Sequence, residues 1–233
     1  MLLRSSLEYH HAMHSGTWRS FVHALVMSAL ASCAWAETAA SGKALPDRLL
    51  GPPFTLRSRA SLGPDEAAVI VIEITDFRCE HCRQFHERVF PRIKQRYVDT
   101  GLVRYIALPA AQAGETPAPA VLGVARHALA LGKFWDVRGA LFAHAQERDV
   151  AGLARKIGLD PAAATAGVRA AETQAAVAAD AAEVAALEIP GTPTFVVRRR
   201  LARGGFVEAR VEGYESWDHF NTLLTDMLQR EEP

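Results

Sequence analysis

A run of apolar, mostly β-branched residues extends over Ala68-Val69-Ile70-Val71-Ile72-Glu73-Ile74 and contains one charge, Glu73. The run has the length of a strand, and its apolar residues do not alternate with polar ones. This pattern is typical of a strand that is buried on both faces of an α/β sheet. We therefore predict a central strand that carries one conspicuous acidic side chain.

A helix with one apolar face is predicted to begin at about Cys79. Its apolar residues recur every four positions at Phe85, Val89, Ile93 and Tyr97. Because this stripe continues beyond Pro91, the proline is expected to bend the helix rather than end it. Residues 102–108 form the next short apolar segment, so strand, helix and strand predict a parallel βαβ unit.

From about residue 120 to 187 the pattern indicates helices only. Asp149 is a predicted N-cap, and Asp160-Pro161 supplies an N-cap and a proline at the first helical position. The pairs Phe134-Trp135 and Leu141-Phe142 have helical spacing and are expected to pack between these helices and the sheet.

Strand-forming residues return at 194–197 and 207–211 on either side of Gly204-Gly205, and a last helix is predicted at 216–229. The arginines at 198–200 and Arg203 lie in this hairpin, where a solvated tip is the expected role and a membrane-surface or partner contact is the alternative.

The 233 residues suit one domain that carries an insertion. We assign residues 65–110 and 188–230 to an α/β core and 111–187 to a helical insertion. Residues 37–64, rich in Gly, Pro and Ser, are expected to form a tether with a short strand near residues 54–56. The 26 basic and 26 acidic side chains give no reason to expect a nucleic-acid partner.

Residues 1–36 have the features of an export signal. Arg19 precedes an apolar stretch at 21–31, which is too short to span a membrane, and Ala34-Trp35-Ala36 offers a cleavage site. Counted from Met13, the segment has the ordinary signal length of about 15 to 30 residues, so Met13 is the expected start. A helical or disordered arm of a cytosolic protein is the alternative interpretation.

A second processing site overlaps the first, because Leu30-Ala31-Ser32-Cys33 resembles a bacterial lipobox. Lipidation of Cys33 would anchor the mature protein to a membrane. Either cleavage removes Cys33 from redox chemistry and leaves Cys79 and Cys82 as the working thiols, which suits an oxidising compartment.

The segment Cys79-Glu80-His81-Cys82 is the candidate centre of chemistry. Unpaired N–H groups and the dipole at a helix start stabilise a thiolate, so Cys79 is the expected nucleophile. Cys82, one turn further on, is expected to resolve the mixed disulfide, and His81 to favour the thiolate. The pair alone is a weak signal, because it also occurs in zinc sites and as ordinary core cysteines.

The segment Gly191-Thr192-Pro193-Thr194 leads into the later strand. A proline that opens a strand beside an active site is a natural place for a cis peptide bond. Thr192 and Pro193 are therefore candidate substrate-binding residues, with free backbone that can pair with a peptide.

Three segments together resemble the DsbA-like family of thioredoxin-fold thiol-disulfide oxidoreductases. They are residues 72–86, Gly132-Lys133-Phe134-Trp135 and Gly191-Thr192-Pro193-Thr194-Phe195. The resemblance implies an α/β protein with a thioredoxin fold and an inserted all-helical subdomain, with a cis proline at Pro193. It also implies a periplasmic enzyme that exchanges disulfides with cysteine-containing exported proteins, a membrane redox partner, and no cofactor beyond the Cys79-Cys82 disulfide.

Glu73 matches the position at which the family places a buried carboxylate beneath the disulfide. A desolvated carboxylate has a raised pKa and can relay the proton that Cys82 must lose. A strand-end Glu that points to solvent is the alternative. Arg104 on the next strand is a possible charge partner.

Glu80 departs from the family pattern, which commonly has proline there. An anion beside Cys79 disfavours the thiolate and is expected to shift the potential by some tens of millivolts. We therefore expect a more reducing potential than that of the family's strong oxidants.

Two other classes of protein are compatible with the same residues. Cys79, His81, Cys82 and His86 lie within eight residues, but a structural zinc site usually needs a second ligand pair, so no metal site is predicted. A redox-inert peptide-binding or metal-binding module on the same fold is the remaining alternative.

Overall fold

A computed structural model describes residues 59–110, 119–202 and 204–229 of the chain. The predicted signal peptide, Cys33, Arg203 and the strand expected near residues 54–56 lie outside these ranges. Within the described ranges, no helix combines the length and the apolar character that crossing a membrane requires.

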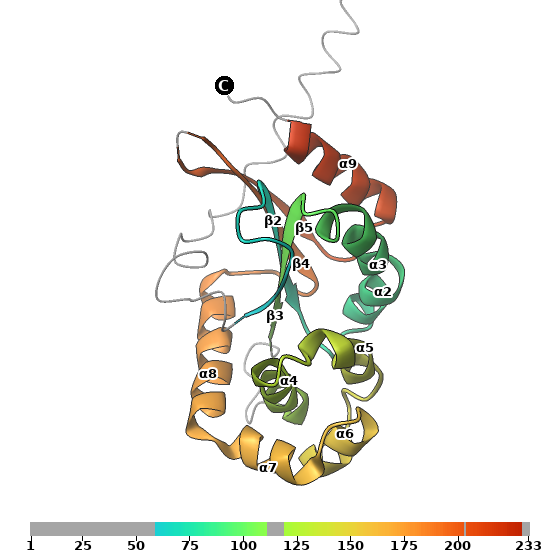
Figure 1. Cartoon of the computed structure of the whole chain (residues 1–233), viewed down its shortest axis with the longest axis vertical. Coiled ribbons are helices and arrows are strands. Elements are labelled where there is room, and N and C mark those ends of the chain that lie inside the picture. Colours follow the sequence, from blue (N-terminus) through green and yellow to red (C-terminus); the bar gives the residue numbers. More distant parts are fainter. Residues whose placement is uncertain (1–58, 111–118, 203, 230–233) are drawn as a thin grey trace, which may run out of the picture. The chain divides into compact units, whose positions relative to one another are not determined.

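A sheet with the strand order β1-β3-β2-β4-β5 forms the centre of the fold (Figure 1). Its strands are β1 (Ala60–Leu62), β2 (Val69–Thr75), β3 (Val103–Pro109), β4 (Thr194–Arg200) and β5 (Phe206–Glu212). The predicted central strand is β2, which pairs parallel with β3 and antiparallel with β4. All seven residues of β2 are buried, as expected for a strand covered on both faces.

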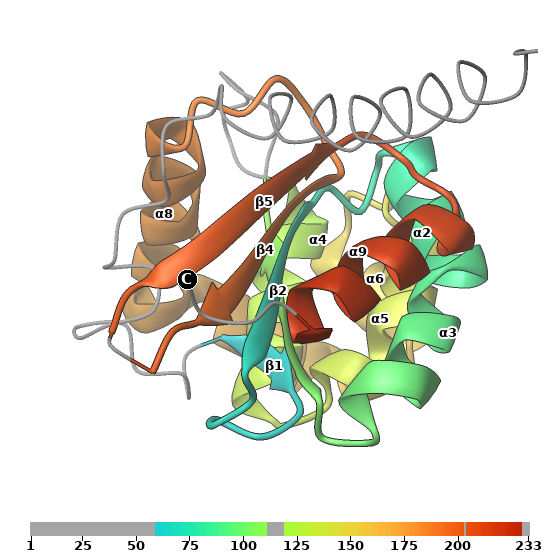
Figure 2. The same ribbon diagram turned by 90° about the horizontal axis from the view of Figure 1, so that it is seen from above.

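Helices cover both faces of the sheet (Figure 2). Because side chains alternate along a strand, Val69 and Val71 face one apolar cluster while Ile70 and Ile72 face another. The first cluster includes residues of α2 (Glu80–Arg88), α3 (Phe90–Ile93), η3 (Lys94–Val98) and α9 (Trp217–Gln229). The second includes Val184 of α8 (Ala171–Ala186).

The segment after Cys79 stays helical past Pro91, as predicted, but it is divided at Val89 into separate helices. Helix α2 ends at Arg88, Val89 stays in the right-handed helical region with a φ of −110°, and Pro91 lies in the first turn of the short helix α3. Proline has no N–H to continue the helical ladder, whereas the first turn of a new helix needs none there. The predicted apolar stripe still holds, because Phe85, Val89, Ile93 and Tyr97 are all buried.

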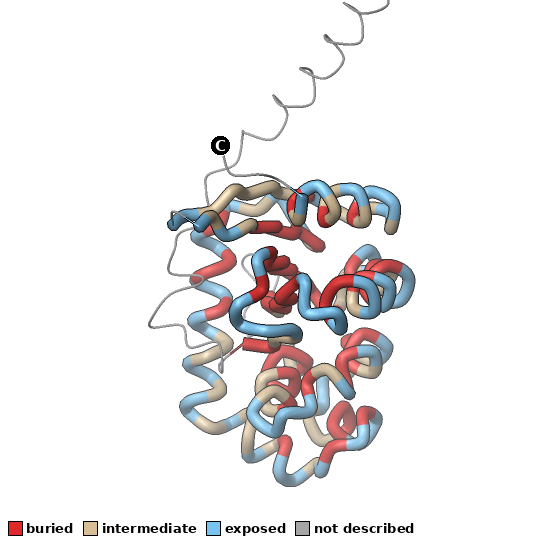
Figure 3. Tube along the Cα trace, turned by 45° about the horizontal axis from the view of Figure 1, so that its top comes forward, coloured by how far each residue is buried: buried red, intermediate tan, exposed pale blue. Residues whose placement is uncertain are grey.

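Among the described residues between β3 and β4 there are five helices: α4 (Ala120–Ala130), α5 (Phe134–Ala143), α6 (Val150–Lys156), α7 (Pro161–Arg169) and α8. Asp149 accepts hydrogen bonds from two N–H groups of α6, and Asp160 accepts one from α7, so both predicted N-caps are present. Figure 3 shows that the buried residues of these helices are on their inner sides. Phe134 and Phe142 pack there against Phe77, which lies between β2 and α2.

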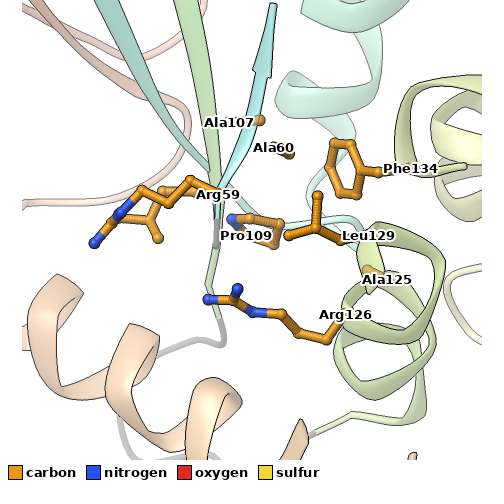
Figure 4. Close-up of a pocket in the computed structure, with 9 residues that line it drawn as sticks. Arg59, Ala60, Ala107, Pro109, Ala125, Arg126, Leu129 and Phe134 are labelled. Atoms are coloured by element: carbon orange, nitrogen blue, oxygen red, sulfur yellow. The ribbon is translucent and has the colours of Figure 1, made fainter. Parts of the chain in front are cut away.

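A small pocket lies where β1, β3 and α4 meet, with Arg59, Pro109 and Arg126 in its lining (Figure 4). Its volume of about 10 Å³ leaves room for a single water molecule at most. Both arginines form ion pairs with α8, Arg59 with Glu183 and Arg126 with Asp180. The pocket therefore lies at a contact that ion pairs with α8 hold together, and it is too small to hold a ligand.

The arginine run does not form the solvated hairpin tip that we predicted. Arg198 is 2% exposed, lies within β4 and pairs with Glu208 of β5 at 2.6 Å. Arg199 donates hydrogen bonds to the Met227 and Leu228 carbonyls at the end of α9. Of the arginines at 198–200, which the structure describes, only Arg200 is exposed. The prediction failed because the strand continues to residue 200, beyond the apolar part of its sequence.

Candidate active site

The two central cysteines have different environments although they lie one helical turn apart. Cys79 is the N-cap residue of α2 and is partly exposed, whereas Cys82 lies inside the helix and is fully buried. The Cys79 N–H donates to the Asp76 carbonyl at 3.1 Å, which fixes the turn between β2 and α2. This turn presents the first sulfur to solvent and places the second in the core.

The Thr192-Pro193 peptide bond is cis, and this segment lies directly beside the cysteine pair. The Cys79 thiol donates to the Thr192 carbonyl at 3.3 Å, across 113 residues of sequence. The predicted approach of Pro193 to the cysteines is thus present. Its backbone is less free than we expected, because the Gly191 and Pro193 carbonyls accept hydrogen bonds from Thr194 Oγ1 and the Gly213 N–H.

Burial raises the pKa of the Cys82 thiol to about 12. Hydrogen bonding from the Asp76 backbone and from the Thr192 and Thr75 side chains opposes this rise, and the nearby Cys79 adds to it. Cys82 is therefore a protonated thiol at neutral pH. The difference in exposure favours Cys79 as the attacking sulfur and Cys82 as the resolving one.

Glu73 is fully buried, not directed to solvent, and both of its carboxylate oxygens are occupied. Arg138 Nη2 donates to the two oxygens at 2.7 and 2.6 Å, and the Tyr105 hydroxyl donates to Oε2 at 2.6 Å. Arg104, the partner suggested by sequence, instead pairs with Asp65 at 2.6 Å. Arg104 and Tyr105 are neighbours on β3, so their side chains point to opposite faces of the sheet. Arg104 was the wrong prediction because it lies on the face opposite to Glu73.

Aromatic rings enclose the Arg138 guanidinium. Its central carbon lies 4.8 Å from the Phe90 ring centre and 5.5 Å from that of Phe142. His86 stacks on the same two rings, with centroid distances of 5.7 and 5.0 Å. Burial, with the positive charge of Arg138, lowers the pKa of His86 to about 4, so the imidazole is neutral at physiological pH.

Glu80 and His81 both lie on the exposed start of α2. The Glu80 carboxylate accepts hydrogen bonds from Arg83 at 2.6 and 2.9 Å and from Gln84 at 2.9 Å. These bonds, with the Arg83 charge, lower the pKa of Glu80 to about 2. The anion that we expected to disfavour the Cys79 thiolate is therefore paired with a cation of its own helix.

A cleft of about 370 Å³ opens beside Cys79. Phe77 and Phe142 line it with apolar surface, and Arg83 and Gln146 line it with polar groups. Cys79 therefore faces a space large enough for several side chains of a peptide, between the start of α2 and the end of α5.

A family model described as thioredoxin matches residues 56–217. The chain belongs to the thioredoxin family. This match confirms the predicted fold class.

Relatives within the thioredoxin family agree with the resemblance to DsbA-like proteins. A probable disulfide bond formation protein D of Bacillus cereus is 43% identical over 51 residues, which cover 22% of this chain and 24% of the relative. The chain thus aligns with about a quarter of the length of that curated relative.

Solved structures match over far more of the chain. A variant of alpha-DsbA1 from Wolbachia pipientis has a TM-score of 0.66 at 18% identity, covering 78% of this chain and 96% of that one. A thioredoxin-like oxidoreductase from Silicibacter pomeroyi has a TM-score of 0.62 at 24% identity, covering 81% and 100%. These likenesses show that the fold, including its inserted helices, is that of DsbA-like members of the thioredoxin family.

Sequence reasoning missed the contacts that Arg138 and Tyr105 make with Glu73. A signal for Arg138 was present, because it lies four residues after Phe134 and four before Phe142, on the apolar stripe of its helix. A charge on such a stripe and the lone charge Glu73 in a buried strand suggest that the two charges pair. In the described part of the chain, no group of three or more His, Cys, Asp or Glu side chains is arranged to hold a metal ion.

Proposed function

We propose that this protein is an exported thiol-disulfide oxidoreductase that exchanges disulfides with substrate proteins through Cys79 and Cys82. One observation carries the proposal. A partly exposed cysteine at a helix start contacts the carbonyl before a cis proline, and its partner cysteine is buried one turn away. A pair of ordinary core cysteines would need neither the exposure of Cys79 nor this contact.

The exchange proceeds in two steps that balance. The Cys79 thiolate attacks one sulfur of a substrate disulfide, forms a mixed disulfide, and releases the other substrate sulfur as a thiolate. Cys82 then loses its proton, attacks Cys79 Sγ, and expels the second substrate thiolate. The substrate gains two electrons, and the Cys79-Cys82 disulfide forms; oxidation of a substrate is the same sequence in reverse.

The mixed disulfide also changes what the backbone at the site can bind. Cys79 loses its S–H proton when it bonds to substrate, so the Thr192 carbonyl loses its present donor. That carbonyl is then free to accept a hydrogen bond from a substrate N–H, while the cleft beside Phe142 receives the flanking side chains. Thr192 and Pro193 keep their proposed role in substrate binding, and extended peptides with a cysteine are the proposed substrates.

The names of the relatives support this assignment. The probable disulfide bond formation protein D of Bacillus cereus is identical at 43% of the 51 aligned residues, although these cover only 24% of its length. We extend the activity to this chain because the site geometry described above suits it. Export to the periplasm, a membrane protein that restores the redox state, and the alternative lipid anchor at Cys33 are parts of the same proposal.

Trapping of substrates tests the proposal most directly. Cys82→Ala removes the resolving thiol, so mixed disulfides at Cys79 should accumulate in the native compartment and release their partners on reduction. Cys79→Ser is the matched control, because it retains the buried thiol and should trap nothing. Purified protein should in addition reduce insulin or refold reduced ribonuclease. Failure of both turnover assays together with an empty trap would disprove the proposed function.

The mass of the mature protein separates the two processing sites. Cleavage after Ala36 gives an unmodified soluble chain, whereas processing before Cys33 gives a chain that carries lipid. A full-length cytosolic product would contradict export without affecting the redox proposal.

A further inference from the structure

Strand β5 is an open edge of the sheet, because in the described part of the chain it pairs with β4 alone. Figure 2 shows it as the outermost strand. The opposite edge strand, β1, has three residues, whereas β5 has seven that pair with β4 in unbroken register. Proteins usually shorten a sheet edge or protect it with lysine, proline or a bulge, and β5 has none of these. Such an edge is suited to pairing with another strand.

Hydrogen bonds at both ends of the β4–β5 hairpin show which backbone groups of β5 face outward. The Leu201 N–H donates to the Gly205 carbonyl at 3.2 Å, and the Gly213 N–H donates to the Pro193 carbonyl at 2.8 Å. Because hydrogen-bonded and non-hydrogen-bonded pairs alternate along an antiparallel ladder, every second residue between these bonds points its N–H and C=O away from β4. These residues are Phe206, Glu208, Arg210 and Glu212.

The sequence of β5 is complementary to itself in one antiparallel register. When Ala209 lies opposite Ala209 of a second copy, Glu208 of each copy lies opposite Arg210 of the other. The same register places Phe206 opposite Glu212. All the outward-facing residues therefore meet one another, and each can form a hydrogen-bonded pair with its counterpart.

The charges on this edge suit the same register. Glu208 and Arg210 are partly accessible, with side chains 22% and 19% exposed. Arg210 Nε lies 3.2 Å from Glu212, while its Nη2 group has no hydrogen-bond acceptor within the described residues. Arg210 therefore retains donors for a carboxylate of another chain, and opposite charges that face each other across two strands stabilise the pairing.

We propose that two copies of this protein associate through β5, antiparallel and about a two-fold axis at Ala209, so that their sheets become continuous. Each β5 ends beside Pro193, through the bond from Gly213. Antiparallel pairing therefore places the two cysteine sites at opposite ends of the shared strand pair. Association should leave disulfide exchange unchanged, and the inference does not depend on the proposed function.

Site-directed cross-linking tests the register. In a background without the native cysteines, Ala209→Cys places two thiols across the axis at a non-hydrogen-bonded pair, where Cα atoms lie about 4.5 Å apart, a distance that a disulfide spans. Val207→Cys is the matched control on the same face of β5, because its counterpart is Val211 and not Val207. Oxidation by oxygen with copper phenanthroline should link Ala209→Cys into dimers on a non-reducing gel and leave Val207→Cys monomeric.

Sedimentation equilibrium of the purified protein, in the form that its cells accumulate, tests the charges. Arg210→Glu and Glu208→Arg each place like charges opposite each other, and each should raise the dissociation constant of the dimer about tenfold or more. A mixture of the two variants restores opposite charges at both positions and should associate as a heterodimer. Arg148→Glu, at an exposed arginine of the helical insertion, is the control and should leave the dissociation constant unchanged.

Three results would overturn the inference: a wild type that stays monomeric at millimolar concentration, a dimer that Arg210→Glu does not weaken, or cross-linking of Val207→Cys in preference to Ala209→Cys. If residues before Arg59 of the same chain occupied the edge, the wild type would stay monomeric, and the inference would be wrong. Insulin reduction is measured separately and should be equal for the wild type and Arg210→Glu. Its absence in both would contradict the proposed function, and the sedimentation result would still decide the dimer.

Discussion

Two arginine–carboxylate pairs flank the cysteines, and they differ almost only in their surroundings. Glu73 and Arg138 lie 2.6 Å apart with both side chains fully buried. Glu80 and Arg83 lie 2.6 Å apart with side chains 57% and 37% exposed. The distance is the same, but the first pair joins two distant parts of the chain and the second joins two residues of one helical turn.

Burial decides what each pair contributes. Removing one partner of a buried pair leaves an unpaired charge in the core, which is strongly unfavourable, whereas water and salt screen an exposed pair. The buried pair is therefore expected to govern whether the fold around Cys82 forms, and the exposed pair to make small adjustments to Cys79. The variants below test this contrast, from the largest expected effect to the smallest.

Arg138→Met should have the largest effect. The substitution leaves Glu73 buried without a cation, and we expect it to lower the free energy of unfolding by about 3–5 kcal/mol. Urea denaturation followed by circular dichroism measures the change.

The double variant Glu73→Leu with Arg138→Met removes both charges and serves as the control. It should recover part of the lost stability, although the Tyr105 hydroxyl then lacks its partner. A double variant no more stable than Arg138→Met alone would show that packing, and not charge, sets the cost.

His86 should make stability depend on pH. Because burial lowers its pKa from about 6.5 to about 4, the unfolded chain binds a proton more readily than the folded protein. The free energy of unfolding therefore has its full value with respect to His86 above pH 6.5. It decreases as the pH falls from 6.5 towards 4.

His86→Phe keeps a ring between Phe90 and Phe142 but cannot titrate. Urea unfolding midpoints of this variant should fall less than those of the wild type between pH 6.5 and 4. Parallel curves for the two proteins over this range would contradict a buried neutral imidazole.

Glu80→Gln should have a smaller effect, which disappears in acid. The Glu80 pKa is lowered from about 4.5 to about 2, so its contribution is present above pH 4.5 and is lost as pH falls through 2. The variant should match the wild-type melting temperature at pH 2 and fall slightly below it at pH 7. A melting temperature far below that of the wild type at pH 7 would mean that this exposed pair makes a large contribution to stability.

Arg83→Ala should have the smallest effect of the set, and the redox potential is the property that reports it. Removal of the cation exposes the Glu80 charge next to Cys79, which should make the pair more reducing by some tens of millivolts. Titration against glutathione measures the shift, and adding Glu80→Gln to Arg83→Ala should reverse it. A shift in the oxidising direction would show that Glu80 does not act on Cys79 through its charge.

The sequence was most informative where one local pattern determines the structure. The apolar run around Glu73 predicts β2, and the side chains of Asp149 and Asp160 predict two helix starts, because each depends on neighbouring residues alone. The fold class followed from such local patterns and from the resemblance, and the family match confirms it.

Contacts between distant segments were harder to predict. Sequence suggested Arg104 as the partner of Glu73 because it is near on the next strand, whereas the actual partner, Arg138, comes from a helix 65 residues away. The burial of Arg198 was missed for the same reason, because it depends on Glu208 across a hairpin. The roles assigned to Cys79, Cys82 and their neighbours stay predictions until the variants described above are measured.

The reach of Arg138 from α5 to β2 matters to anyone who would engineer a smaller redox module from this chain. Joining β3 directly to β4 would delete helices α4 to α8 and keep Glu73, but the carboxylate would then lie in the core with no counterion. The same excision would strip Phe134 and Phe142 from the cluster that buries Cys82. A minimal design must therefore neutralise position 73 and supply a new apolar cover for the resolving thiol.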